Sequence, residues 1–175
     1  MPQRSVVAVG ASLLVASLAL AGCGSRSDDT EGTDTGSAEN KVAKIGVIAP
    51  LSGDLAALGK GIQNSVDLAI RQANEAKTIP GWTLELAAED DQATPDVGKN
   101  AATKLAADKD VVGVVGTLNS SVAQSVQPVL AAANIVQVSP ANTNPSRPQP
   151  AASAPAPQRT YPTYFRTCTT DSVQG

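Results

Sequence analysis

The 175-residue chain contains no histidine, and aromatic side chains make up only 2% of it. Without histidine, the chain cannot itself supply a Ser-His-Asp or Cys-His catalytic site or a histidine-ligated metal. With so few aromatic residues, any core must consist of aliphatic side chains and alanine. The formal net charge is −3 and no basic stripe is present, so nucleic acid is not an expected partner. The length suits one well-packed domain.

Residues 1–22 have the pattern of an export signal, with Arg4 followed by an apolar run over residues 6–21. This run is shorter than the roughly 20 residues that a spanning helix needs. Its end, Leu20-Ala21-Gly22-Cys23, resembles the lipobox of bacterial lipoproteins, in which the cysteine is diacylated and the chain is cut before it. Buried acyl chains, at about 0.8 kcal/mol per CH₂, anchor a protein stably. We therefore predict that Cys23 is lipidated and holds the protein at the extracytoplasmic face of the cell membrane. The alternative is an ordinary secretory signal with a chance cysteine.

Composition divides the rest of the chain into four segments. Residues 24–40 contain no leucine, isoleucine, valine or aromatic residue, and they carry five acidic side chains against one basic. Such a stretch cannot bury a core, so residues 23–43 are predicted to be the lipidated cysteine and a disordered acidic tether. Residues 44–145 carry regular hydrophobic patterns and are predicted to fold as one α/β lobe. A loop rich in proline and alanine is predicted for residues 146–163, and a last strand with the approach to another helix for residues 164–175.

Hydrophobic periodicity predicts alternating strands and helices. Apolar or alternating runs predict strands at residues 44–49, 82–88, 111–115 and 135–138, with a fifth at 164–167. Stretches with helical periodicity predict helices at about residues 55–76, 95–108 and 122–133. Within the last of these, Pro128 predicts a kink or a local break. The order β-α-β-α-β-α-β with a following strand predicts a parallel sheet with flanking helices, in the flavodoxin-like order 2-1-3-4-5.

Two loops rich in hydroxyl and amide groups follow neighbouring strands of the predicted sheet. Residues 117–121 read TLNSS, and residues 139–144 read SPANTN. Because the carboxyl ends of parallel strands lie at one edge of a sheet, we expect these loops side by side. Neutral hydroxyls and amides suit a small polar ligand. A single loop of this kind would be interpreted as a turn or a helix cap, but two on adjacent strands favour binding.

Four stretches together resemble a known family: IGVIAPLSGDLAALGKGIQNSVDLAIRQAN, EDDQATP, VVGVVGTLNSSVAQ and VSPANTNP. In this order, behind a lipobox and a tether, they resemble type I periplasmic solute-binding proteins of bacterial ABC importers, and most closely the branched-chain amino-acid (Leu/Ile/Val) binding group. The resemblance implies no enzymatic activity and no cofactor or metal. It implies an amino acid or small amide as the ligand, held between two lobes, and an ABC permease in the membrane as the partner.

The resemblance also assigns residues to the site. Ser120 falls where a serine hydroxyl of the family meets the ligand carboxylate at a helix N-terminus, a place that holds an anion without a basic side chain. Ala141 and Thr143 fall where a backbone carbonyl and a hydroxyl take the ligand ammonium group. Ser121 and Asn142 are neighbouring candidates for ligand contact.

The chain departs from the family in three respects. Leu58 stands where many members place an aromatic side chain over the ligand, which leaves the side-chain preference open. The resemblance covers only a first lobe, so the chain is expected to be truncated, with residues 164–175 leading into a missing second lobe that supplies an acidic group for the ammonium. Cys168 has no partner if Cys23 is lipidated, and we expect its partner in the absent half.

Other functions remain open from the sequence alone. A ligand-binding lobe of a sensory receptor would present the same site, and a non-functional fragment is a further alternative. A surface serine hydrolase would use Ser52 or Ser120 with Asp90 or Asp91, but the chain has no G-x-S-x-G elbow and no histidine base. Trp82 is interpreted as a packing residue at a strand end in preference to a platform for a ligand.

Overall fold

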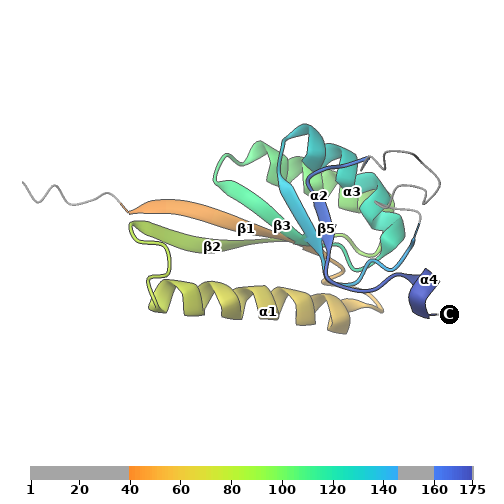
Figure 1. The fold of residues 1–175 in the computed structure, drawn as a ribbon, viewed down its shortest axis with the longest axis horizontal. Coiled ribbons are helices and arrows are strands. Elements are labelled where there is room, and N and C mark those ends of the chain that lie inside the picture. Colours follow the sequence, from red (N-terminus) through yellow and green to blue (C-terminus); the bar gives the residue numbers. More distant parts are fainter. Residues whose placement is uncertain (1–39, 146–159, 175) are drawn as a thin grey trace, which may run out of the picture. The chain divides into compact units, whose positions relative to one another are not determined.

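A computed structural model describes residues 40–145 and 160–174 (Figure 1). All of these residues belong to one compact unit, Ser37–Gly175. The predicted signal peptide, Cys23, the tether as far as residue 39 and most of the proline-rich loop lie outside the described residues. Within the described ranges, none of the helices has the length and apolar character that crossing a bilayer requires.

Five parallel strands form one sheet in the order β2-β1-β3-β4-β5. The strands are β1 (Lys41–Ala49), β2 (Trp82–Asp90), β3 (Val111–Gly116), β4 (Val136–Ser139) and β5 (Tyr164–Arg166). This is the flavodoxin-like order that the sequence predicts, and β2 is an edge strand as its alternating pattern indicates. The predicted fold class, a parallel sheet with flanking helices, is confirmed.

Helices cover the two faces of the sheet unequally (Figure 1). They are α1 (Ala56–Glu75), α2 (Pro95–Ala107), α3 (Ser120–Ala132) and the short α4 (Asp171–Gln174). Helices α2 and α3 pack side by side on one face, and α1 lies on the other face over β1 and β2. Because all the strands are parallel, every strand's carboxyl end, and the loop that follows it, lies at the same edge of the sheet.

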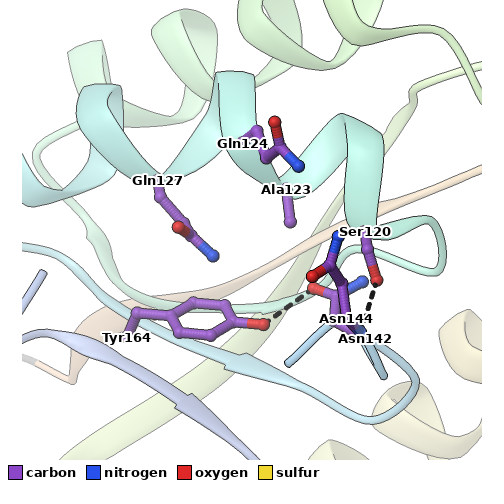
Figure 2. A pocket seen from close by; sticks show the side chains of 7 residues that line it. All are labelled: Ser120, Ala123, Gln124, Gln127, Asn142, Asn144 and Tyr164. Carbon is purple, nitrogen blue, oxygen red and sulfur yellow. Dashed lines mark hydrogen bonds between the residues drawn. The ribbon is translucent and has the colours of Figure 1, made fainter. Parts of the chain in front are cut away.

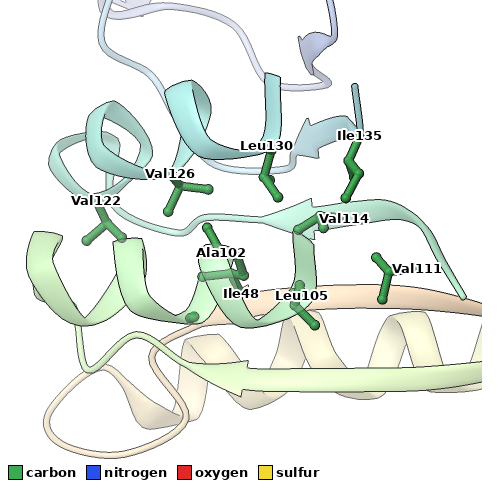
Figure 3. Packing of buried hydrophobic residues seen from close by; sticks show 10 residues of the cluster. Ile48, Ala102, Leu105, Val111, Val114, Val122, Val126, Leu130 and Ile135 are labelled. Carbon is green, nitrogen blue, oxygen red and sulfur yellow. The ribbon is translucent and has the colours of Figure 1, made fainter. Parts of the chain in front are cut away.

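The core lies between the sheet and the layer of α2 and α3 (Figure 3). It consists of aliphatic side chains, as the scarcity of aromatic residues predicts. Its larger members are Ile48, Leu105, Val111, Val114, Val122, Val126, Leu130 and Ile135. Each fully buried side chain of this size stabilises the fold by about 1.5–3 kcal/mol. The buried side chains of Val122, Val126 and Leu130 therefore fix the position of α3, and with it the loop at its start.

The face covered by α1 is less completely buried. Of the residues in α1, only Gly59 and Ile70 are buried. An apolar groove runs beside the helix, and it is lined by Leu58, Gly61, Ile62, Ser65, Val66, Val115, Leu118, Pro140 and Ala141. The groove reaches from the middle of α1 to the loop that follows β4. We refer to it below as the α1 groove.

Two close backbone approaches require glycine. A Cβ atom at Gly59 would lie 1.9 Å from the carbonyl oxygen of Pro50, so the first turn of α1 can rest on the end of β1 only without a side chain there. Gly116 has a φ of +134°, and a Cβ atom would lie 2.0 Å from the carbonyl oxygen of Ile48. Both glycines lie at the edge of the sheet that carries the loops.

Apart from shifts of one or two residues at other element ends, two details differ from the sequence-based expectations. β1 begins at Lys41, earlier than predicted, because Lys41 pairs with Trp82 and extends the ladder with the edge strand. Of the kink or local break predicted at Pro128, the break is not observed: α3 continues through this residue to Ala132. The buried side chains of Val126 and Leu130 flank the proline and hold this part of the helix against the core.

Candidate functional site

The loops after β3 and β4 are joined by hydrogen bonds at the carboxyl edge of the sheet. The Ser139 hydroxyl at the end of β4 donates to the carbonyl oxygen of Thr117 at 2.9 Å. The Asn142 side-chain amide donates to the carbonyl oxygens of Thr117 at 3.0 Å and Leu118 at 3.1 Å. The two segments that the sequence predicts to meet are therefore in direct contact.

Ser120 is the first residue of α3 and lies at the junction of these loops. Its hydroxyl accepts a hydrogen bond from the backbone N–H of Asn144 at 3.3 Å (Figure 2). The first N–H groups of a helix have no partner within the helix, and the helix dipole is positive at this end. The first turn of α3 contains no acidic residue. The position is thus electrostatically suited to an anion, and the assignment of Ser120 to a ligand carboxylate stays a prediction.

Asn142 is buried, and both ends of its side chain are engaged inside the protein. Its amide nitrogen donates to the loop after β3, and its Oδ1 accepts a 2.9 Å bond from the Tyr164 hydroxyl of β5 (Figure 2). Burial raises the pKa of Tyr164, so the hydroxyl stays protonated and remains a donor. The geometry shows Asn142 holding the loops together.

The other predicted site residues surround this junction. Thr143 is half-buried, and its carbonyl oxygen accepts a bond from the N–H of Asp171 at 2.9 Å. Ser121 is exposed on the first turn of α3. Leu58, with 58% of its surface exposed, lines the α1 groove together with Ala141. Polar groups and an apolar wall therefore lie at one edge of the sheet, the combination that small-molecule sites use.

A small polar pocket lies behind the loops and is distinct from the α1 groove. Figure 2 shows Gln127 of α3 and Tyr164 of β5 pointing toward one another, with Ser120 and Asn142 nearby. Its space suits about one water molecule and is too small for an amino acid. The Oε1 atom of Gln127 is buried there without a hydrogen-bond partner among the described residues. A ligand would therefore have to bind outside this pocket.

Ser52 and Asp90, which the alternative function, a serine hydrolase, would use, lie in an arrangement that fastens the loop after β1. The carboxylate of Asp90 accepts bonds from the Ser52 hydroxyl and, at 2.8 Å, from the N–H of Leu51. Burial opposes ionisation of Asp90, but these bonds and one from the N–H of Gln92 lower its pKa. Asp91 is buried, and its pKa is raised because burial disfavours the charged carboxylate. Asp90 thus fastens the loop after β1, and an acid held in its ionised form by several donors is a poor general base.

Two further residues that the sequence singles out, Trp82 and Cys168, are not among the proposed ligand contacts. Trp82 is at the amino end of β2, opposite the loops, with the Lys41 ammonium 5.4 Å from its ring centroid. Cys168 is a free thiol that donates to the carbonyl oxygen of Asn142 at 3.2 Å. In residues 40–145 and 160–174, no group of acidic, cysteine or histidine side chains is placed to hold a metal ion.

Comparison with known proteins agrees with this geometry. Residues 42–175 match the family model described as periplasmic binding protein. The chain belongs to this family. The resemblance inferred from the sequence is therefore confirmed, and the family comprises substrate-binding proteins and not enzymes. Membership also implies that this periplasmic binding protein works outside the cytoplasm.

Individual relatives are similar over part of their length. The Leu/Ile/Val-binding protein homolog 2 of Brucella abortus (strain 2308) is 33% identical over 131 residues, which are 75% of this chain and 33% of that protein. An ABC transporter substrate-binding protein of Desulfitobacterium hafniense, solved in complex with Leu, is 25% identical with a TM-score of 0.60 over 76% of this chain and 36% of that one. A solute-binding protein of Rhodopseudomonas palustris BisB5 in complex with 3,4-dihydroxy benzoic acid has a TM-score of 0.59 at 25% identity, over 74% of this chain and 32% of that one. This periplasmic binding protein spans about a third of the length of the curated relatives it matches.

Sequence reasoning missed several residues of this region. Asn144 was part of the second loop but was not singled out, although its N–H contacts Ser120. Leu118 lines the α1 groove beside Ala141, and only its position in the first loop could have suggested this. Tyr164 and Arg166 reach the second loop from β5. No local pattern links them to that loop, because some twenty residues of chain lie between.

Proposed function

We propose that this chain is the first lobe of the extracytoplasmic substrate-binding component of an ABC importer, and that it binds branched-chain or related small amino acids. The observation that carries the proposal is the hydrogen bond from the Asn144 N–H to the Ser120 hydroxyl, because it brings the two predicted ligand loops together. The Leu/Ile/Val-binding relatives and the solved complex with Leu support the ligand class. The permease would be the membrane partner, and the ligand would be delivered to it after the lobes close.

In this proposal each end of a zwitterionic ligand has its own place. The Ser120 hydroxyl and the N–H groups at the start of α3 hold the carboxylate. The Ala141 carbonyl and the Thr143 hydroxyl take the ammonium group. Leu58 stands at the start of the α1 groove, where an aliphatic ligand side chain would pack, and Ser121 lies at the exposed margin.

A single lobe offers only one side of a site that closes between two lobes. Ligand bound to it stays in contact with water, and the groups of the other lobe are not engaged. We therefore expect the 175-residue chain to bind its ligand very weakly, with an affinity far below that of a complete two-lobe protein.

Calorimetric titration with a panel of ligands tests the proposal. The panel contains leucine, isoleucine, valine, other amino acids, urea and short amides, and it includes an aromatic acid because one relative was solved with 3,4-dihydroxy benzoic acid. The expected result is weak saturable heat with aliphatic amino acids and none with the aromatic acid. Absence of heat with every compound at millimolar concentrations, together with absence of shifts in the NMR spectrum, would contradict it.

The lipid anchor is a separate part of the proposal. It rests on the lipobox-like sequence ending at Cys23. Expression in a bacterium followed by membrane fractionation should place the wild-type chain in the membrane fraction, with a mass increase for acyl chains. Cys23→Ser should release it or leave the signal uncut. A wild-type chain that is fully released and carries no acyl mass would contradict lipidation without affecting the ligand assignment.

A further inference from the structure

Arg166 of β5 contacts the backbone of the second ligand loop, residues 139–144. Its Nη1 atom donates to the carbonyl oxygen of Asn142 at 3.0 Å and to that of Asn144 at 2.8 Å. The two hydrogens of one guanidinium nitrogen therefore bridge alternate residues of the loop. Bonds from a charged donor to carbonyl groups are stronger than bonds between neutral groups, so this bridge fixes the curvature of the loop.

Backbone bonds from the same part of the chain complete the attachment. The N–H of Thr167 donates to the carbonyl oxygen of Ser139 at 3.0 Å, and the N–H of Asp171 donates to that of Thr143 at 2.9 Å. The carbonyl oxygens of three consecutive residues, 142, 143 and 144, are thus all bonded to β5 and the residues after it.

This arrangement leaves a defined set of groups for the ligand. The Ala141 carbonyl receives none of these bonds, and neither does the Thr143 hydroxyl. They are the two groups to which the proposed function assigns the ligand ammonium. Because the carbonyls of residues 142, 143 and 144 are already occupied, an ammonium group that reaches this part of the loop would meet the Ala141 carbonyl and the Thr143 hydroxyl.

We propose that Arg166 is a positioning residue for the ligand site, which acts by holding the Asn142 and Asn144 carbonyls so that Ala141 and Thr143 face the ligand. The proposal rests on the proposed function. Arginine suits this role because it stays charged at all relevant pH values and presents several donors in a rigid plane. Asn142, held in this way, keeps its side chain on the loop after β3.

The test uses Arg166→Met, which keeps the apolar stem but removes the donors, and Arg166→Lys, which keeps the charge. Arg71→Met is the matched control, because Arg71 is an exposed guanidinium on α1 paired only with the nearby Asp67 among the described residues. Two readouts are taken on the full chain by NMR. The first is hydrogen exchange at the amides of Asn142 and Asp171, with amides of β3 as an internal reference. The second is the leucine concentration that half-saturates the shift of the Thr143 amide.

Arg166→Met is expected to speed exchange at the Asn142 and Asp171 amides by about tenfold or more, while amides of β3 stay protected as in the wild type. It should weaken leucine binding by about tenfold. Arg166→Lys should give exchange rates and a half-saturating leucine concentration between those of Arg166→Met and the wild type. Arg71→Met should match the wild type in both readouts. Unchanged loop exchange in Arg166→Met would overturn the proposal. An equal rise in the exchange rates of the β3 amides would also overturn it, since that indicates a merely structural role. If wild-type chain shows no leucine shift, the proposed function fails, and the exchange measurement alone then decides whether Arg166 positions the loop.

Discussion

The hydroxyl of Ser120 and the backbone N–H of Asn144 are joined by a hydrogen bond of 3.3 Å, although the residues belong to different strand-to-helix units of the chain. The bond links the start of α3 to the loop after β4. It works together with the bonds that Asn142 makes to the loop after β3. The site is therefore a junction of two loops, and a substitution in either loop should change the affinity for a ligand that contacts both.

Replacing Ser120 by alanine should weaken ligand binding more than it weakens the fold. The substitution removes the hydroxyl proposed to meet the ligand carboxylate, and one hydrogen bond to a charged group corresponds to roughly tenfold in affinity. The bond that it removes from Asn144 is long, so the change in unfolding free energy should stay below about 1 kcal/mol. Ser125→Ala, on the same helix, is the control. Equal ligand affinities for the two variants would argue against the assigned role of Ser120.

Glycine at position 59 should be indispensable, whereas glycine at position 61 should not. A methyl group at Gly59 would lie 1.9 Å from the Pro50 carbonyl oxygen, while Gly61 has open space around its Cβ position. Gly59→Ala should therefore lower the unfolding free energy by more than about 2 kcal/mol, because α1 must move away from the end of β1. Gly61→Ala should raise it by up to about 1 kcal/mol through helix propensity. Urea unfolding of the two variants checks this, and similar midpoints would contradict the packing described for α1.

Loss of the Asn142 side chain should lower the unfolding free energy more than loss of the Tyr164 hydroxyl, to which it is hydrogen-bonded. Asn142→Ala leaves the Leu118 carbonyl and the Tyr164 hydroxyl without their present partner, and it removes one of the two donors to the Thr117 carbonyl, which keeps the Ser139 hydroxyl. We expect a loss of about 3 kcal/mol in unfolding free energy. Tyr164→Phe removes only one bond and should cost about 1 kcal/mol. Because the residues share a bond, the double variant should be less unstable than the sum of the two. Strictly additive effects in denaturant unfolding would show that the bond contributes little.

Asp91 should make the protein less stable as the pH rises. Burial raises its pKa in the folded state above the ordinary value of 3.8. The unfolded chain therefore loses this proton at a lower pH than the folded chain. The free energy of unfolding falls as the pH rises from 3.8 to the raised pKa of the folded state. Asp91→Asn should accordingly be more stable than the wild type at neutral pH, with the difference shrinking as the pH approaches 3.8.

The adjacent Asp90 supplies a control of opposite sign. Its folded-state pKa is lowered from 3.8, because bonds from Ser52, Gln92 and Leu51 outweigh the effect of burial. The stability that ionised Asp90 gives the fold is present above pH 3.8 and is lost as the pH falls through the lowered pKa of the folded state. Asp90→Asn should therefore be less stable than the wild type at neutral pH. Urea midpoints measured from pH 3 to pH 7 that shift in the same direction for both variants would contradict these two assignments.

Much of the fold is predictable because the hydrophobic periods agree with the tertiary structure. The runs at Val111 and Ile135 and the stripe of Val122, Val126 and Leu130 fix the strands, the helix between them and the face that α3 buries. The rule that parallel strands end at one edge then places the two loops together. The early start of β1 was missed because it depends on pairing with Trp82, which local patterns do not reveal.

The hydrogen bonds that hold the site together were less predictable than the fold. Asn142 was a candidate for ligand contact, yet both ends of its side chain bind the protein, and this follows from a contact with Tyr164 across a long loop. Arg166 reaches the same loop from β5. Such contacts depend on how distant segments are brought together, so sequence spacing alone carries no sign of them. Of the kink or local break expected at Pro128, the break is absent for a similar reason, because buried side chains on both sides of the proline hold the helix against the core despite the lost bond.

The central claim, that the two loops form one ligand site, is tested most directly by titrating the isotope-labelled chain with leucine and following the Ser120 and Thr143 amides in one series of NMR spectra. The account predicts that both signals shift and saturate with the same dissociation constant, while signals from the amino end of β2 near Trp82 stay in place. Shifts confined to one loop, or two different dissociation constants, would contradict it.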